Sequence, residues 1–152
     1  MKNITKKEPV SVELSLQHLV QTLLPQYQAV AVTQNSFFTN HVPPALAIAT
    51  DKGVVTSLLS KLLLFAANHC KDTCIKISAK AFHNIIVMHI KDSSMLNNDL
   101  RLPELENLQS SADEIGGHVE ITSQRKKETT IAFSFINQPV HQHSELLNRI
   151  MK

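Results

Sequence analysis

Three side chains that commonly bind metal ions stand close together near the middle of the chain. His69, Cys70 and Cys74 form a His-Cys-x3-Cys group, and imidazole and thiolate are ligands that zinc prefers. A structural zinc site usually has four tetrahedral ligands, and the sequence offers no fourth histidine or cysteine nearby. We interpret the cysteines as buried or half-buried free thiols, with a zinc site as the alternative. His141 and His143 form a weaker metal pair, more typical of a polar stretch.

Two charged side chains also stand where they could meet a ligand. Lys61 lies four residues before Phe65, which places both on one helix face, one turn apart. The Lys61 ammonium could attract a phosphate or a carboxylate, or it could be a solvated surface lysine. Asp92 follows an apolar run and precedes Ser93 and Ser94, with which it can cap a turn.

Residues 51–92 supply the elements that must position these side chains. Asp51 precedes an amphipathic helix and is expected to cap its first turn. The runs Ile75–Ala79 and Ile85–Ile90 have the length and apolar content of strands and predict a hairpin. The helix face that we expect to be buried carries apolar residues at the helical repeat: Val55, Leu58, Leu59, Leu62, Leu63 and Ala66.

The flanking segments complete a small α/β unit. Residues 12–24 predict a helix, and Ala29–Thr33 and Leu46–Thr50 predict strands. A helix from Pro103 should stop at Gly116 in a left-handed conformation, and two further strands follow it. The expected fold is an α/β two-layer sandwich, a mixed sheet of about five to seven strands with about three helices on one face.

This order of elements resembles the ATP-binding domain of bacterial sensor histidine kinases, part of the GHKL superfamily, over residues 11–138. In that family the helix carries two asparagines, and an alanine follows the second. Their positions, ten and fourteen residues after the capping aspartate, hold Lys61 and Phe65 here, and Ala66 follows. The frame of the motif is kept, but both of its asparagines are replaced.

The second family motif is an Asp-x-Gly-x-Gly box after the hairpin. It reads Asp92-Ser-Ser-Met-Leu96 here, so the aspartate is kept and both glycines are replaced. The long lid that closes on ATP in the kinases is also missing, because only about twenty residues separate Leu96 from Glu114, most of them in the predicted helix. His18 is followed by Leu19 rather than an acidic residue, so we interpret it as a surface residue, not a phosphoacceptor.

The resemblance implies that Lys61, Phe65, Asn68, Asp92 and Ser94 mark a vestigial nucleotide cleft. Mg²⁺ needs oxygen ligands, but Phe65 offers none and Lys61 repels a cation. Phe65 either plugs the cleft or is an ordinary core residue. Asn68 would reach the metal position only after a one-turn shift of the helix. Asp92 corresponds to the family's adenine-binding aspartate, which is the alternative to its role in a turn.

We therefore expect a degenerate histidine-kinase-type ATPase-like domain in two-component or phosphorelay signalling. It would bind proteins, such as a response regulator, a kinase or a second copy of itself, without a cofactor and without ATP hydrolysis. One alternative is an active, Mg-ATP-binding sensor histidine kinase domain with an atypical cleft built on Asp92 and Asn68. Another is an anti-sigma-type regulatory switch, which shares the fold.

Bulk properties agree with one folded domain. The chain has 152 residues, of which 43% are hydrophobic, and its formal charge of +2 is too small to indicate nucleic-acid binding. No apolar run is long enough to predict a membrane span, and the N-terminus lacks the apolar core of an export signal. Two cysteines favour a reducing cytoplasm. Residues 1–10 predict a flexible arm, and residues 139–152 a tail or short helix.

The interpretation of the cysteines as free thiols predicts that zinc does not co-purify with the protein in stoichiometric amount. Elemental analysis of the purified chain measures this directly. One zinc per chain, lost in the Cys74→Ser variant, would establish the metal site instead.

Overall fold

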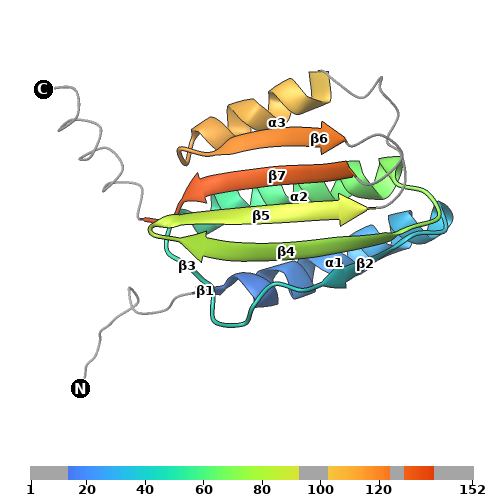
Figure 1. The fold of residues 1–152 in the computed structure, drawn as a ribbon, viewed down its shortest axis with the longest axis horizontal. Helices are drawn as coiled ribbons and strands as arrows, with labels where there is room; N and C mark the ends of the chain where they lie inside the picture. Colours follow the sequence, from blue (N-terminus) through green and yellow to red (C-terminus); the bar gives the residue numbers. More distant parts are fainter. Residues whose placement is uncertain (1–13, 93–102, 124–128, 139–152) are drawn as a thin grey trace, which may run out of the picture.

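A mixed five-stranded sheet with three helices on one face forms the described part of the chain, residues 14–92, 103–123 and 129–138 (Figure 1). The structure is a computed structural model. Its elements in chain order are β1 (Leu14–Ser15), α1 (Leu16–Thr33), β2 (Phe37–Asn40), β3 (Ala47–Ile48), α2 (Lys52–His69), β4 (Cys74–Phe82), β5 (Ile85–Asp92), α3 (Pro103–Asp113), β6 (His118–Ser123) and β7 (Thr129–Ile136). No helix in these ranges is long and apolar enough to cross a membrane.

The sheet has the strand order β2-β4-β5-β7-β6. The β2–β4 pair is parallel and the other three pairs are antiparallel. A parallel pair needs a crossover connection, and α2 provides it. β1 and β3 form a separate antiparallel pair. The predicted two-layer sandwich with a mixed sheet is therefore confirmed.

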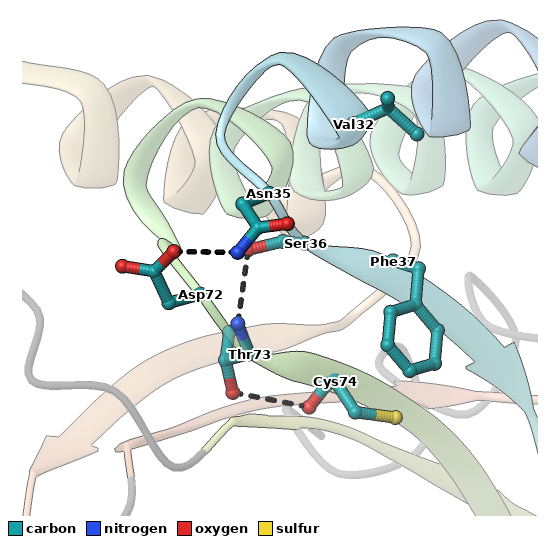
Figure 2. Close-up of a pocket in the computed structure, with 7 residues that line it drawn as sticks. All are labelled: Val32, Asn35, Ser36, Phe37, Asp72, Thr73 and Cys74. Carbon is teal, nitrogen blue, oxygen red and sulfur yellow. Dashed lines mark hydrogen bonds between the residues drawn. The ribbon is translucent and has the colours of Figure 1, made fainter.

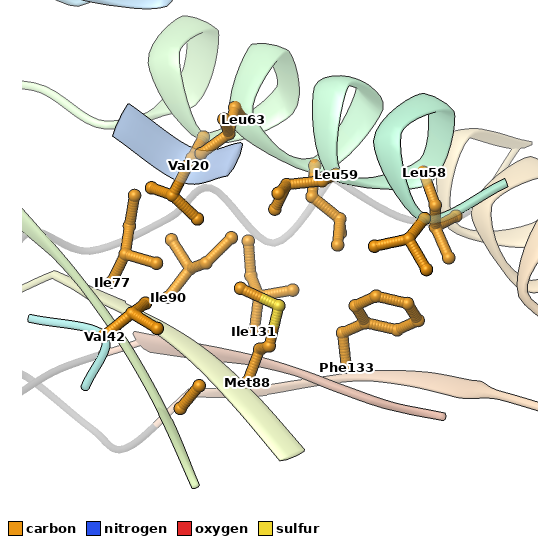
Figure 3. Packing of buried hydrophobic residues seen from close by; sticks show 14 of the residues in the cluster. Val20, Val42, Leu58, Leu59, Leu63, Ile77, Met88, Ile90, Ile131 and Phe133 are labelled. Carbon is orange, nitrogen blue, oxygen red and sulfur yellow. The ribbon is translucent and has the colours of Figure 1, made fainter. Parts of the chain in front are cut away.

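Helix α2 forms as the sequence predicts. Asp51 caps it, because its Oδ1 accepts a hydrogen bond from the Val54 amide at 3.1 Å. All six apolar residues of the predicted stripe are buried. Figure 3 shows side chains of this stripe packed over Met88, Ile131 and Phe133 from the sheet. Each fully buried leucine of this kind stabilises the fold by on the order of 2 kcal/mol.

Helix α1 is longer than predicted, and the strand predicted at Ala29–Thr33 is wrong. The helix runs through the exposed Pro25 and continues to Thr33. Its buried face continues past the proline to Ala31, and a short apolar run cannot by periodicity alone be told from a strand. The strand that follows, β2, was not predicted. His18 is exposed, as expected.

Other predicted boundaries are closer to the structure. The strand predicted at Leu46–Thr50 shortens to the two residues of β3. Both hairpin strands, both C-terminal strands and the helix that starts at Pro103 are present. The predicted arm over residues 1–10 and the tail over 139–152, with its histidine pair, lie outside the described residues.

At each edge strand of the sheet, a glutamine side chain from the neighbouring helix forms hydrogen bonds to the backbone. The amide of Gln28 on α1 accepts from the Phe38 N–H at 2.9 Å and donates to the Phe38 carbonyl at 3.1 Å. On the opposite side, Gln109 on α3 accepts from the Val119 N–H at 2.9 Å and donates to the Gly117 carbonyl at 3.3 Å. These side chains satisfy backbone groups that would otherwise lack a strand partner.

The turn from α3 into β6 depends on two glycines. Gly116 has φ of +62°, the left-handed conformation predicted for it. At Gly117 a Cβ would lie 2.7 Å from the Ser134 carbonyl oxygen and 3.1 Å from that of Ala112. Because both neighbours are backbone atoms, they cannot move aside easily, and only glycine fits.

We predict that Gly117→Ala lowers the free energy of unfolding by about 1–3 kcal/mol, because the added methyl overpacks this turn. Gly53→Ala is the matched control. Its nearest neighbour would be the Asp51 side-chain oxygen at 3.2 Å, and alanine favours the helix. Urea unfolding of both variants measures the difference. Equal stabilities of the two variants would show that the turn at Gly117 accommodates the added methyl group without cost.

Candidate functional site

A groove of about 470 Å³ lies between α2 and α3 and is the candidate site. Three of the five predicted site residues, Lys61, Phe65 and Asn68, line it from α2. The remaining lining residues are Leu64 from α2 and Asn107, Leu108, Ser110 and Ser111 from α3. Its volume falls in the range of small-molecule pockets.

Helical spacing explains why these side chains meet. Positions 61, 65 and 68 are separated by four and three residues, so they share one face of α2. Residues 107, 108 and 111 likewise share the face of α3 that turns toward them. Sequence reasoning missed the α3 contribution. The polar residues repeated along that helix were the available signal.

Lys61 ties the two helices together. Its Nζ donates a hydrogen bond to the Ser111 hydroxyl at 3.0 Å. The same two residues also line a second hollow of about 320 Å³, near Asp51 and Glu114 at the start of α2. The hydrogen bond therefore lies where the two hollows meet. Lys61 on α2 therefore directs its ammonium group toward α3, where a neutral hydroxyl accepts its hydrogen bond.

Phe65 forms a wall of the groove. Its side chain is only 5% exposed, so the predicted burial is confirmed. Its ring centroid lies 4.6 Å from that of His69, one turn further along α2, in a tilted arrangement. An apolar ring therefore forms this part of the groove wall.

Asp92 does not line the groove. It ends β5, where it pairs with Thr129 of β7, and it is 6% exposed. The Cys70 thiol donates to its Oδ2 at 3.1 Å. Burial, followed by the charge of Asp92, raises the pKa of the Cys70 thiol far above its usual value. The thiol therefore stays protonated and acts as a hydrogen-bond donor. Ser94 lies outside the described residues.

The residues of this groove do not fit Mg-ATP. The polar groups of its described lining residues are one ammonium, the amides of Asn68 and Asn107, and the hydroxyls of Ser110 and Ser111. Mg²⁺ is normally held by carboxylates together with phosphate oxygens, and none of the described lining residues carries a carboxylate.

The cysteines of the His-Cys-x3-Cys group have different surroundings. Cys70 is buried against Asp92, whereas the half-buried Cys74 lines a third hollow of about 450 Å³ at the start of β4 (Figure 2). There the Asn35 amide donates to the Asp72 carboxylate at 2.8 Å and joins two loops. Both cysteines are free. Among the described residues, no group of three histidine, cysteine or acidic side chains could hold a metal ion.

Solved structures share this fold. No protein-family model and no curated protein sequence matches the chain. The Acinetobacter baumannii histidine kinase AdeS superposes with a TM-score of 0.73 at 13% identity, over 83% of this chain and 66% of that chain. The catalytic domain of the histidine kinase ThkA superposes with a TM-score of 0.70 at 14% identity, over 86% and 97%. The fold is that of histidine kinase catalytic domains.

A third match is to a histidine kinase that was crystallised in a complex. The histidine kinase ThkA, crystallised in complex with the response regulator protein TrrA, superposes with a TM-score of 0.66 at 16% identity. The match covers 84% of this chain and 42% of that chain. The complex is a property of ThkA.

Burial of Phe65 leads to a stability prediction. Phe65→Ala should lower the free energy of unfolding by about 3–5 kcal/mol, because it removes a buried ring. Phe65→Asn should be worse, since its amide would need partners in an apolar place. Leu64→Ala is the control, because that neighbour is 43% exposed. Denaturant melts of the three variants measure these changes in the free energy of unfolding. A Phe65→Ala variant as stable as wild type would assign the ring to an interaction surface.

Proposed function

We propose that this chain is a degenerate histidine-kinase-type ATPase-like domain that acts in two-component or phosphorelay signalling by binding a protein, without hydrolysing ATP. The observation that carries the proposal is the composition of the α2–α3 groove. Phe65 forms its wall, and Lys61 is hydrogen-bonded across it to Ser111. Both residues stand at positions where the kinase family has asparagine.

The state of Asp92 supports the same proposal. Its carboxylate is buried and accepts a hydrogen bond from the Cys70 thiol. An adenine amino group would have to reach this carboxylate beside a neighbour that already donates to it. The proposed role of Asp92 is therefore structural: it anchors the end of β5 to the end of α2. Cys70 is the C-cap residue of α2.

The proposed partner is a response regulator or a kinase. Support comes from the shared fold with ThkA, which forms a complex with a response regulator. On this chain the outer rim of the groove offers a contact surface, because Leu64 is 43% exposed between the polar side chains of Lys61 and Asn68. An exposed leucine flanked by polar groups is a suitable centre for a small, transient protein interface.

The absence of nucleotide binding tests the proposal. Calorimetric titration of the 152-residue chain with Mg-ATP and with Mg-ADP should give no saturable heat at micromolar concentration, because none of the described lining residues of the groove carries a carboxylate for the metal and the sequence has no glycine-rich loop for the phosphates. Saturable binding that is weakened by Lys61→Ala and by Asp92→Ala would overturn it. That result would favour the active kinase domain with an atypical cleft.

A further inference from the structure

The sheet face turned away from the helices is a second surface with a distinct chemistry. Along β4, β5 and β7 the inward residues are buried, and the residues between them point to this open face, which Figure 1 views from the front. No described helix covers it. It lies on the opposite side of the sheet from the α2–α3 groove, so an occupant here would not compete for that groove.

One row of this face crosses the whole sheet and consists of hydrogen-bond donors. Lys76 on β4 stands directly opposite Lys91 on β5. The register adds one threonine from each remaining strand: Thr39 from β2, Thr130 from β7 and Thr122 from β6. Like charges directly opposite each other destabilise a sheet, so this pair costs the folded chain some stability. An anion held between the two ammonium groups would remove that repulsion.

The positive potential extends along the hairpin. Lys80 also points to this face, and His89 lies between Lys80 and Lys91. Burial, followed by the charges of Lys91 and Lys80, lowers the pKa of His89 below its usual value. Among the outward residues in the described part of β4 to β7, Glu120 is the one acid. Its partner His118 lies 4.0 Å away, on the same strand.

The far end of the same face is apolar. Phe82 and Ile85 stand opposite each other at the hairpin turn and are 65% and 37% exposed. The open face therefore joins a large exposed aromatic and aliphatic pair to a basic centre. Exposed aromatic anchors beside charged groups are typical of protein interfaces.

We infer that the open sheet face, defined by Lys76, Lys80, Lys91, Phe82 and Ile85, binds an acidic segment of a protein partner. Carboxylates of the segment pair with the three lysines, and an apolar side chain covers Phe82 and Ile85. A protein fits better than a nucleic acid. The formal charge of the chain is only +2, and the basic part of the face is short and ends at an apolar patch.

Binding of a fluorescent polyglutamate peptide to the 152-residue chain at low salt tests this surface. The double variant Lys76→Gln/Lys91→Gln should lose affinity on the order of tenfold, because both charges contact the anion. It should fold at least as stably as wild type, because the repulsion is gone. The matched control Lys52→Gln/Lys71→Gln removes the same charge from exposed lysines away from the open face and should bind within about twofold of wild type.

A second readout follows His89 directly. Binding of the peptide should raise the pKa of His89, measured by NMR titration, because carboxylates offset the charges of Lys91 and Lys80 that lower it. Glu120 lies two strands away in the same row as His89, and it is present in both the free and the peptide-bound protein. Equal loss of affinity in the two double variants, or an unchanged His89 pKa, would refute the surface. Tighter binding of an oligothymidylate or of anionic lipid vesicles would refute the protein partner.

Discussion

The seating of α2 on the inner face of the sheet is the packing on which the rest of the structure depends. The fully buried Leu58, Leu59, Leu62 and Leu63 meet the inward residues of β4, β5 and β7. Because an apolar stripe of the helix is turned to the sheet, a flank that carries Lys61, Phe65 and Asn68 is left for the groove with α3. One helix therefore fixes both the core and the side chains that line the groove.

The same constraint explains which features the sequence could predict. The periodicities of α2, β4 and β7 are strong, because each element buries one face and exposes the other, whereas β5 was predicted from the length and apolar content of its run. Asp51 as a cap and Gly116 as a left-handed stop follow from local chemistry and are confirmed. The region from Ala29 to Asn40 was misjudged. Its apolar residues suit a strand as well as a buried helix, and only packing against α2 decides between them.

The meeting of three of the predicted residues in one groove has a similar reason. Lys61, Phe65 and Asn68 belong to one helix face, and helical geometry brings them together. Ser111 and Asn107 could not be assigned to that face, because their place depends on how α3 packs against α2. The Cys70–Asp92 hydrogen bond joins residues 22 positions apart at the ends of a helix and a strand, and no local sequence pattern predicts it. The resemblance to the kinase family singled out Asp92 but not its neighbour Cys70.

The two edge glutamines limit how this domain can associate with other chains. Gln28 and Gln109 already occupy outward backbone groups of β2 and β6, where an incoming strand would otherwise add. These two contacts obstruct sheet extension from copy to copy at one position on each edge, and such extension is a direct route to fibrous aggregation. Association through the proposed open face would instead depend on side chains, so its specificity would rest on residues that mutation can change one at a time.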